Sequence, residues 1–565
     1  MRTQKEIEQE IKVWKNADLP NDLKKELSNS NKKQLEDEFY TNLNFGTAGM
    51  RGLLGVGTNR MNIFTVGQVT EALARHIDNQ GKKIKERGVV ISGDSRINSS
   101  LFEKVSAEIL RAHDINVYLF SGPHPTPELS FTLMRLQAYA GIMITASHNT
   151  KDYNGYKLYG EDGGQLPPEP TQEIVHERQN INDIFNIKRV SSNIKKINEK
   201  SDKLYLDAVK TVTFDRSLIK RWSDKLSISF TPLHGAGGKL GLKALKQAGF
   251  NKAYGVKEQM KPDGKFPTVK YPNPEFHNVF KLSDKYKADI ELAIDPDSDR
   301  MGVGYLDDNG RYQYLTGNQI ASLMVKYILT FQKQAGTLPK NGAIITSNVS
   351  SNLPELIANS FNIKQITVLT GFKYIADKIV EFDKKKNYKF EFGFEESYGF
   401  LIKPFVHDKD GIQAITLMAE IAAYYKDRGM TIGDGLEEIY NKYGYFTEQQ
   451  VSEEYPGENG KKKISSLMGN LRKKGPKRVG DINIITIDDN DLKLSKSLDN
   501  GRTKRIQLPK ANVIKYWLKD GSWIAVRPSG TEPKLKLYFG AKGTDANESH
   551  KRLTYLEKEF KQNLA

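Results

Sequence analysis

Residues 144–157 read Ile-Thr-Ala-Ser-His-Asn-Thr-Lys-Asp-Tyr-Asn-Gly-Tyr-Lys and place a hydroxyl among cationic side chains. The preceding apolar run, Ala140–Ile144, stops abruptly at small polar residues, as expected where a strand reaches the end of a sheet. Ser147 would lie at that end, with His148 beside it and Lys157 following. A hydroxyl in such a loop is a candidate nucleophile or phosphate carrier. The competing interpretation is a strand-to-helix turn in which Ser147 caps the helix.

A second segment, Asp295-Pro-Asp-Ser-Asp-Arg300, follows the apolar run Ile290–Ile294 and carries carboxylates at alternate positions. Negative charges in one short loop repel one another, and a divalent cation relieves that repulsion. Carboxylate oxygens suit Mg²⁺. An EF-hand is excluded because the glycine that it requires at its sixth loop position is Arg300 here. The alternative is a solvated acidic turn. The expected metal ligands are Asp295, Asp297 and Asp299.

A third segment, Gly393-Phe-Glu-Glu-Ser-Tyr-Gly399, concentrates hydrogen-bond acceptors between glycines and aromatic residues. The carboxylates of Glu395 and Glu396 and the hydroxyl of Ser397 are suited to sugar hydroxyls, which need acceptors in a fixed geometry. The alternative is a helix N-terminus with acidic residues in its first turn.

The fourth segment, Val526-Arg-Pro-Ser-Gly-Thr-Glu-Pro-Lys-Leu-Lys536, combines cations, hydroxyls and a glycine. Glycine allows the backbone to approach a ligand closely, and backbone N–H groups can form an anion-binding nest. An arginine adds a planar fork for phosphate oxygens. The alternative is a surface hairpin turn. The candidate phosphate-binding residues are Arg527, Ser529, Gly530, Thr531 and Lys536.

Together the four segments resemble the active-site loops of the α-D-phosphohexomutase superfamily, the phosphoglucomutase and phosphomannomutase family. The order agrees: phosphoserine loop, metal loop, sugar loop and phosphate loop. The segment 44–52, Asn-Phe-Gly-Thr-Ala-Gly-Met-Arg-Gly, also resembles the family's N-terminal active-site segment. The resemblance extends from about residue 40 to about residue 540. It implies three related α/β domains with mixed sheets, a C-terminal α+β domain, and an active site in a central cleft.

The resemblance also implies roles for individual residues. Ser147 would be phosphorylated in the active enzyme, and a phosphoserine oxygen would join the aspartates as a Mg²⁺ ligand. Arg300 would be the neighbouring active-site arginine, and Glu395 with Ser397 would grip sugar hydroxyls. Thr370 and Gly371 would contact the sugar from the third domain. The cationic groups around the reaction centre would be Arg51, Lys157 and Lys409.

Two points of the resemblance stay open. The general base could be Lys157, Arg51 or His148, and the sequence does not choose among them. The family usually has proline after Ser-His-Asn, whereas this chain has Thr150. Because proline fixes φ, we expect a slightly less rigid loop with the nucleophile retained.

The expected activity is the reversible interconversion of glucose 1-phosphate and glucose 6-phosphate. Phospho-Ser147 would donate its phosphoryl group to give glucose 1,6-bisphosphate, which serves as intermediate and activator, and would recover a phosphoryl group from the other end. Phosphomannomutase and phosphopentomutase activities remain alternatives with the same mechanism, and synthesis of a sugar bisphosphate is a rarer one. The alternative of another class is a catalytically silent sugar-phosphate-binding protein.

Internal repetition supports the expected fold. Strand–loop–helix patterns begin at Val89–Arg96, Leu226–Phe230 and Ala343–Thr346, which suggests three related α/β domains. A dinucleotide-binding motif is excluded because the position of its third glycine is Leu240. After residue 446 strand-like runs precede a helical pattern at Glu548–Leu564. The expected domains are 1–205, 206–316, 317–445 and 446–565.

Composition fits an enzyme without disulfides or thiolate metal sites, because none of the 565 residues is cysteine. No apolar run approaches the roughly 20 residues of a membrane helix, so we expect no membrane contact and a cytoplasmic location. The formal net charge is +16. The densest basic cluster, 461–478, lacks aromatic residues for base stacking and has the spacing of an amphipathic helix, so we expect no nucleic-acid partner. Sugar phosphates are the expected partners, for a monomer or weak homo-oligomer.

Overall fold

The computed structural model describes residues 2–46, 49–455, 458–529 and 534–564. This part of the chain forms two compact units. Unit 1 combines Met1–Gly317 with Phe372–Thr431, and unit 2 combines Asn318–Gly371 with Ile432–Ala565. The expected domain boundaries near residues 205, 316 and 445 stay predictions.

The N-terminal helices of unit 1 pack around one tryptophan. Trp14 is fully buried, and its ring makes edge-on contacts with Phe39, Phe64 and Phe185 at centroid distances of 5.4–5.6 Å. Such aromatic contacts add to the stabilisation from apolar burial. The three helices are α1 (Gln4–Asn16), α2 (Asn21–Asn29) and α3 (Lys32–Phe39).

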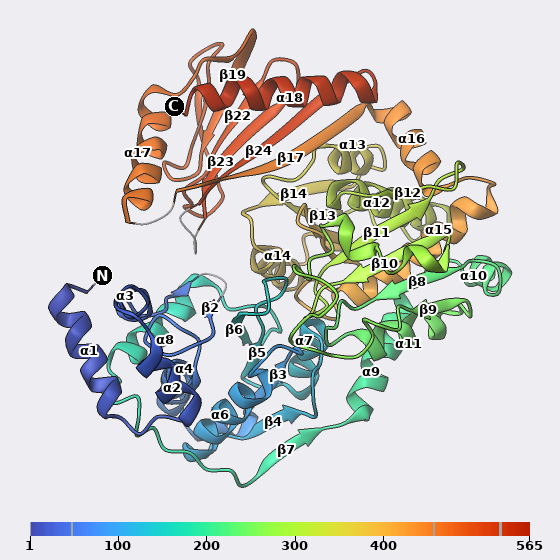
Figure 1. Ribbon diagram of the computed structural model, residues 1–565. Coiled ribbons are helices and arrows are strands. Elements are labelled where there is room, and N and C mark those ends of the chain that lie inside the picture. The colour runs from blue at the N-terminus through green and yellow to red at the C-terminus, as the bar shows by residue number, and fades with distance from the viewer. Residues whose placement is uncertain (1, 47–48, 456–457, 530–533, 565) are drawn as a thin grey trace. The chain divides into compact units, whose positions relative to one another are not determined.

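A mixed sheet forms the centre of the first α/β part (Figure 1). Its parallel strands are, in spatial order, β5 (Ala140–Ile144), β3 (Val89–Gly93), β4 (Val117–Phe120) and β7 (Ile194–Ile197). From β5 the sheet continues through the antiparallel strands β6 (Tyr153–Gly160), β2 (Gly49–Leu53) and β1 (Phe45–Gly46). β3 and β5 are buried along their whole length, as expected for parallel strands covered on both faces. The neighbouring helices are α4 (Ile63–Gln80), α5 (Lys82–Arg87), α6 (Ser99–Ala112), α7 (Thr126–Leu136) and α8 (Pro168–Gln179).

A second mixed sheet of unit 1 repeats this plan. Its parallel strands are β9 (Ala253–Gly255), β8 (Ile228–Thr231) and β10 (Ile290–Ile294), and β11 (Met301–Leu306) and β12 (Tyr312–Tyr314) continue it in antiparallel fashion. The antiparallel strands β15 (Lys389–Glu395) and β16 (Gly399–Leu401) form a hairpin. The other α-helices here are α9 (Glu199–Val209), α10 (Arg216–Trp222), α11 (Gly238–Ala248), α14 (Phe372–Lys385) and α15 (Gly411–Asp427). Short 3₁₀ turns occur at Lys210–Val212, His277–Phe280 and Asp284–Tyr286.

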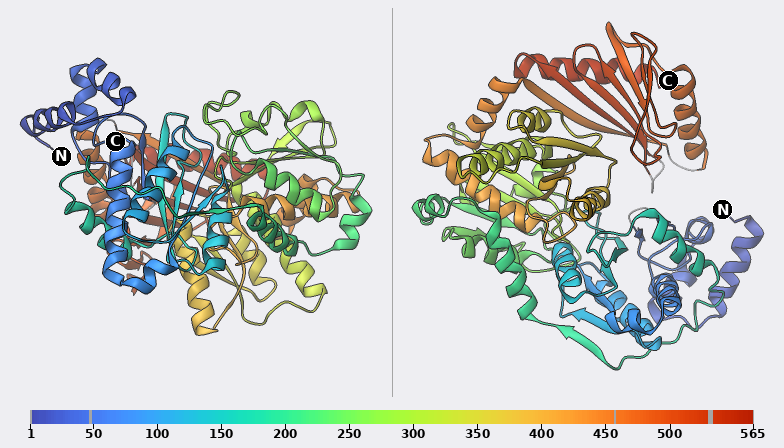
Figure 2. Two further views of the ribbon diagram at one scale, coloured as in Figure 1. Left: turned by 90° about the horizontal axis from the view of Figure 1, so that it is seen from below. Right: turned by 180° about the vertical axis from the view of Figure 1, so that it is seen from behind.

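Unit 2 contains a parallel strand pair and a large antiparallel sheet. The pair is β13 (Gly342–Ser347) and β14 (Lys364–Val368), accompanied by α12 (Gly317–Gln334), α13 (Leu353–Asn359) and α16 (Ile432–Tyr443). The sheet runs in the order β17 (Tyr445–Glu454), β24 (Lys534–Gly543), β23 (Trp523–Pro528), β22 (Ile514–Leu518), β19 (Ile482–Asp489), β20 (Leu494–Ser497) and β21 (Thr503–Arg505). β18 (Arg478–Val479) pairs with β19. The helix α18 (Ala546–Gln562) lies against β24 and β17 (Figure 2).

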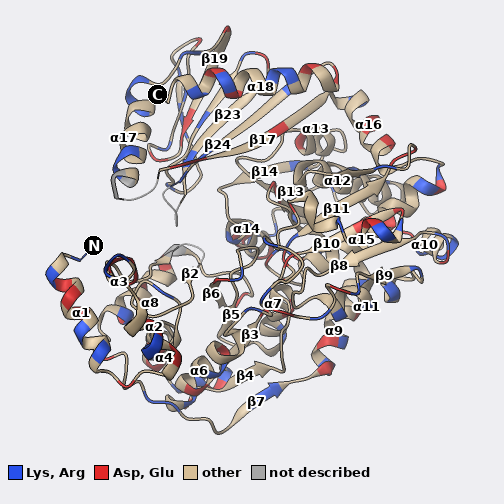
Figure 3. Ribbon diagram, viewed as in Figure 1, with Lys and Arg blue, Asp and Glu red and all other residues tan. Residues whose placement is uncertain are grey.

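The sequence predicted the class of these elements correctly. Mixed α/β sheets precede a C-terminal α+β part, and the strands expected at 140–144 and 290–294 are β5 and β10. The basic segment forms α17 (Glu458–Lys474), along which Lys and Arg recur (Figure 3). The helix buries Ile464 and Leu471 and leaves Lys473 exposed. Its charges therefore lie on a solvated helix face.

Candidate active site

The serine loop, residues 145–152, carries Ser147 from β5 into β6. Because a strand follows the loop, the alternative that Ser147 caps a helix is wrong. Ser147 has a φ of 50°, a left-handed conformation that costs on the order of 1–2 kcal/mol for an L-residue. The Ser147 N–H donates to the Thr145 hydroxyl at 2.8 Å, which helps to hold this turn. Strained backbone of this kind is concentrated at functional sites.

Arg96 anchors the serine loop through its main chain. Its Nη1 donates to the carbonyl oxygens of Thr150 and Tyr153 at 2.7 and 3.0 Å. Its Nη2 donates to those of Ser147 and Asn149, each at 2.5 Å. Three carbonyls of the loop and that of the first residue of β6 therefore converge on one guanidinium, which fixes the position of the Ser147 backbone.

Asp94 completes this anchor. Its carboxylate lies 3.2 Å from Nε of Arg96, and both side chains are fully buried. Thr145 donates to the same carboxylate at 2.6 Å. Burial raises the pKa of Asp94 and lowers that of Arg96, and each group partly offsets the shift of the other. Sequence analysis assigned no role to Asp94 or Arg96, although the polar residues that end the Val89–Arg96 pattern were the available signal.

The metal loop, residues 295–300, follows β10 directly. Asp295 and Asp297 are fully buried and Asp299 is 2% exposed, so the alternative of a solvated acidic turn is wrong. One oxygen from each carboxylate lies within 4.8 Å of those of the other two. One oxygen of Asp297 and one of Asp299 are buried without a hydrogen-bond partner. The loop thus offers hard oxygen ligands that fit a divalent cation.

The two loops meet at Ser147. Its hydroxyl donates to Asp295 Oδ2 at 2.7 Å and lies 3.2 Å from Nδ1 of His148. The backbone N–H of Arg300 donates to the other oxygen of Asp295 at 3.1 Å. Burial, reinforced by the charges of Asp297 and Asp299, raises the pKa of Asp295 well above its ordinary value. A group placed on the Ser147 hydroxyl would therefore lie directly beside the carboxylates.

Two buried lysines balance part of this negative charge. Lys157 Nζ lies 2.8 Å from Asp297 Oδ2 and 3.4 Å from Asp299 Oδ2. Lys409 Nζ lies 3.2 Å from Asp299 Oδ2 and 3.2 Å from Asp408 Oδ1. Burial opposes the charge of Asp297, but the ammonium of Lys157 outweighs it and holds the pKa of Asp297 well below its ordinary range. Burial likewise lowers the pKa of Lys157 and Lys409, but their aspartate partners outweigh it and raise both.

Three further side chains lie beside the serine loop and the metal loop: those of Arg51, His148 and Arg300. Arg51, on β2, donates to the side chain of Asn149 at 2.8 Å, and Arg300 Nε lies 3.9 Å from Asp299. Burial, together with these two arginines, lowers the pKa of His148 well below its ordinary value. His148 is therefore a neutral imidazole beside the hydroxyl of Ser147.

The sugar loop, residues 393–399, comprises the end of β15, a turn at residues 396–398 and the first residue of β16, so the alternative of a helix N-terminus is wrong. Its Gly399 pairs with Arg300 of the metal loop. The glycine also leaves room for Lys409, because a Cβ there would lie 2.1 Å from the side chain of Lys409. Glu395 is buried and Ser397 half-buried. Unit 1 thus brings together the predicted serine, metal and sugar loops.

The other predicted contacts belong to unit 2. Thr370 and Gly371 follow β14, and the Thr370 hydroxyl donates to the Asn348 side chain at 3.5 Å. Arg527 on β23 pairs with Lys536 on β24. The N–H of Ser529 donates to the carbonyl oxygen of Lys534 at 2.8 Å. Gly530 and Thr531 lie outside the described residues.

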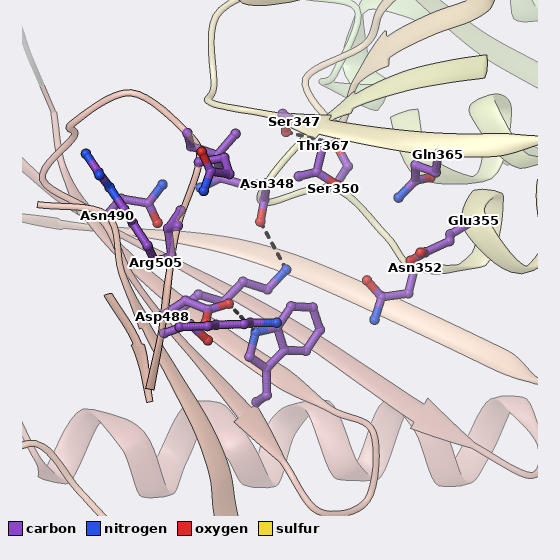
Figure 4. Close-up of a pocket in the computed structure, with 17 residues that line it drawn as sticks. Ser347, Asn348, Ser350, Asn352, Glu355, Gln365, Thr367, Asp488, Asn490 and Arg505 are labelled. Atoms are coloured by element: carbon purple, nitrogen blue, oxygen red, sulfur yellow. Dashed lines mark hydrogen bonds between the residues drawn. The ribbon is translucent and has the colours of Figure 1, made fainter. Parts of the chain in front are cut away.

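Unit 2 also contains a polar cavity of about 530 Å³ that sequence analysis did not predict (Figure 4). Lys515 is buried there between the rings of Trp517 and Trp523, with Nζ at 4.1 and 4.0 Å from their centroids. Its ammonium donates to the carbonyl oxygen of Asn348 at 3.0 Å. Burial lowers the pKa of Lys515 to about 7. Asn348 therefore links this lysine to Thr370.

The chain matches family models along most of its length. They describe the phosphoglucomutase/phosphomannomutase α/β/α domains I, II and III at residues 42–184, 203–308 and 316–443, and the C-terminal domain at residues 485–551. The chain belongs to the phosphoglucomutase/phosphomannomutase family, within the α-D-phosphohexomutase superfamily. Members of this family are isomerases of the phosphohexomutase type. Among the described residues, no helix is long and apolar enough to cross a membrane.

Curated relatives refine this placement. A phosphoglucomutase from Staphylococcus epidermidis is 39% identical over 518 residues, covering 90% of this chain and 93% of the relative. A phosphoglucomutase from Staphylococcus aureus is 38% identical over 515 residues, covering 90% and 91%. The chain is thus similar over most of its length to proteins named phosphoglucomutase.

Solved structures support the fold. The structure of a putative phosphomannomutase from Thermus thermophilus has a TM-score of 0.68 at 20% identity, covering 92% of this chain and 99% of that one. The open form of parafusin, a phosphoglucomutase from Paramecium, has a TM-score of 0.66 at 18% identity, covering 93% and 94%. At these identities the similarity concerns the fold alone.

Proposed function

We propose that this chain interconverts glucose 1-phosphate and glucose 6-phosphate through phosphorylated Ser147, with glucose 1,6-bisphosphate as intermediate and activator. The 2.7 Å hydrogen bond from the Ser147 hydroxyl to Asp295 supports this function most directly, because it places a strained serine against a buried carboxylate triad. The curated relatives named phosphoglucomutase favour glucose phosphate over mannose or pentose phosphate.

We further propose Mg²⁺ as the ion held by Asp295, Asp297 and Asp299, together with an oxygen of phosphorylated Ser147. The all-oxygen donor set and the two unpartnered aspartate oxygens support this choice. Bound there, Mg²⁺ would neutralise charge on the phosphoryl group.

The surrounding side chains fit phosphoryl transfer, which depends mainly on positioning and charge stabilisation. Arg96 holds the Ser147 backbone, while Lys157 and Lys409 place positive charge beside the triad. Arg51 and Arg300 can bind phosphate oxygens through their planar guanidinium groups. His148 is the candidate to exchange a proton with the reacting hydroxyl, since its neutral Nδ1 lies 3.2 Å from the Ser147 oxygen.

The remaining predicted site residues are proposed to recognise the substrate. Glu395 and Ser397 are proposed to bind sugar hydroxyls, with Thr370 and Gly371 contributing a further contact. Arg527, Ser529 and Lys536, with Gly530 and Thr531 by sequence alone, are proposed to bind the phosphate that is not transferred. Sugar phosphates as the small-molecule partners, a monomer or weak homo-oligomer, the lack of a nucleic-acid partner and a cytoplasmic location stay predictions.

The deciding experiment follows glucose 6-phosphate formation from glucose 1-phosphate with Mg²⁺ and a trace of glucose 1,6-bisphosphate. Mannose 1-phosphate and ribose 1-phosphate are run in parallel. We expect glucose phosphate to react fastest and turnover to depend on both additions. Faster turnover of another sugar phosphate would change the substrate and keep the mechanism. Net bisphosphate formation without isomerisation would favour a bisphosphate synthase, and binding without turnover would favour the silent binding protein.

The Ser147→Ala variant tests the nucleophile, and we expect it to retain less than about 1% of wild-type turnover, given the scale of nucleophile deletions. Mass spectrometry of the wild-type peptide should find one phosphate on Ser147 after incubation with the bisphosphate. Thr145→Ser is a matched control, because it keeps the hydroxyl that binds Asp94. Retention of substantial turnover by Ser147→Ala would remove Ser147 from the reaction.

A further inference from the structure

A second cluster of ligand-type side chains lies at one end of helices α7 and α9, which pack against each other. His124 lies just before α7, Glu128 in the first turn of α7, and Asp202 in the first turn of α9. One nitrogen or oxygen atom from each lies within 4.8 Å of those of the other two. The proposed reaction uses none of these side chains.

The carboxylates of this cluster have little to balance their negative charge besides the imidazole of His124, which lies 3.4 Å from Asp202 Oδ1. Glu128 is fully buried, and neither of its oxygens has a hydrogen-bond partner. Asp202 is 6% exposed, and its Oδ1 also lacks one. Among the described residues, no lysine or arginine forms an ion pair with Glu128 or Asp202. A buried carboxylate without a partner is strongly unfavourable, so a proton or a cation must neutralise this pair.

His124 is oriented as a ligand. Its Nδ1 lies 2.9 Å from the carbonyl oxygen of Gly122. Since a carbonyl only accepts hydrogen bonds, Nδ1 carries a proton. Burial lowers the pKa of His124, but the hydrogen bond with Asp202 outweighs it and raises the pKa, so an ion must displace a proton from Nε2 to bind its lone pair. Nε2 lies 3.4 Å from Asp202 Oδ1, close to the separation of about 3.0–3.4 Å between two ligands that are each about 2.1 Å from one ion. An imidazole fixed by a backbone carbonyl is the usual orientation of a metal-binding histidine.

We propose that His124, Glu128 and Asp202 bind a divalent transition-metal ion, with Zn²⁺ as the reference ion. One imidazole and two carboxylates suit Zn²⁺, whereas Mg²⁺ prefers the all-oxygen set of the metal loop. Water would complete the coordination from the side of His124, whose side chain is 15% exposed. The two sites therefore select different ions by their donor atoms.

The second site is connected to the metal loop through Thr126, which lies between His124 and Glu128 in the sequence. The Thr126 hydroxyl donates to Asp297 Oδ2 at 3.1 Å, and its N–H donates to the Asp297 carbonyl oxygen at 2.9 Å. An ion that joins α7 to α9 fixes the start of α7 and therefore the position of Thr126. The second site thus acts as a structural support for Asp297.

The test is equilibrium dialysis of the full chain against Zn²⁺ in excess Mg²⁺, followed by elemental analysis and thermal unfolding. We expect one Zn²⁺ per wild-type chain and a higher Tm with Zn²⁺ present. Glu128→Gln should fold, because it replaces a buried acid by a neutral group of equal shape, and should bind Zn²⁺ at least tenfold more weakly. His124→Asn should likewise fold and bind Zn²⁺ at least tenfold more weakly.

Two controls separate this site from its surroundings. Glu103→Gln changes another buried carboxyl, on α6, and should retain the Zn²⁺. Asp297→Asn, which disables the metal loop, should retain it too. Absence of bound Zn²⁺ from the wild type, or equal binding by Glu128→Gln, would overturn the proposal and leave a proton shared by Glu128 and Asp202. Loss of Zn²⁺ from Asp297→Asn alone would assign the ion to the metal loop.

Discussion

The metal loop buries three carboxylates and the His124–Glu128–Asp202 cluster buries two, and their charges are balanced by different groups. The metal loop places two lysines against its aspartates, at 2.8 Å for Lys157 and 3.2 Å for Lys409. The second cluster has one imidazole and, in the described part of the chain, no paired lysine or arginine. Lys157 holds the pKa of Asp297 well below its ordinary range, so part of the negative charge of the metal loop is balanced before any metal arrives. In the second cluster the imidazole of His124, 3.4 Å from Asp202 Oδ1, takes the place of the lysines, and an ion would neutralise the buried carboxylates more fully.

The largest expected effect comes from removing one carboxylate from each cluster. Asp297→Asn should lower kcat at least about 100-fold, because it removes a ligand and leaves Lys157 without its closest partner. Glu128→Gln should lower kcat less than about tenfold, because it acts on Asp297 only through Thr126. Steady-state assays of both variants at saturating Mg²⁺ measure the difference. Equal losses would contradict the division into a catalytic and a supporting cluster.

An intermediate effect is expected at the anchor of the serine loop. Arg96→Lys keeps the charge next to Asp94 but cannot reach four carbonyls at once. We expect kcat to fall about 10- to 100-fold with little change in KM, because the loop positions Ser147 and does not itself recognise the sugar. Arg178→Lys is the matched control, since Arg178 also donates to a backbone carbonyl, that of Leu43. An Arg96→Lys enzyme with wild-type kcat would show that Ser147 needs no such anchor.

The smallest expected effect is on stability, and it tests whether a proton neutralises a buried carboxyl group that has no other partner. Glu291 on β10 is fully buried, neither of its oxygens has a hydrogen-bond partner, and burial raises its pKa to about 9. A raised pKa means that the unfolded state loses its proton first. The wild type should therefore lose stability between about pH 4.5 and pH 9, with a slope of up to about 1.4 kcal/mol per pH unit. Urea unfolding of Glu291→Gln should show a flatter profile across this range, and parallel profiles would contradict a protonated Glu291.

The contrast between the clusters also shows what the sequence could reveal. Asp295, Asp297 and Asp299 occupy alternate positions in one loop, and Ser147 follows a buried strand. These local patterns predicted the metal ligands and the nucleophile. That Ser147 lies close to Asp295 was expected only through the family resemblance, which makes both of them Mg²⁺ ligands, because the contact joins separate sheets. His124 and Asp202 carry no shared local pattern and meet only because α7 packs against α9.

The role of Arg96 was also not predictable from local sequence. Its partners in the serine loop are carbonyl oxygens, which every residue possesses, so no side-chain pattern in that loop indicates them. The fold class was easier to predict, since buried strands such as β5 and β10 are continuous apolar runs. The phosphate loop was predicted as a binding segment, and its Gly530 and Thr531 lie outside the described residues.

The anchoring of the serine loop has a consequence for how this chain can change over time. Arg96 holds carbonyl groups, so substitutions of loop side chains other than that of Thr145, which binds Asp94, leave the anchor intact. Thr150 illustrates this tolerance, because its carbonyl oxygen accepts the 2.7 Å hydrogen bond from Arg96 although its side chain replaces the usual proline. The loop can therefore accumulate sequence variation while the nucleophile keeps its place.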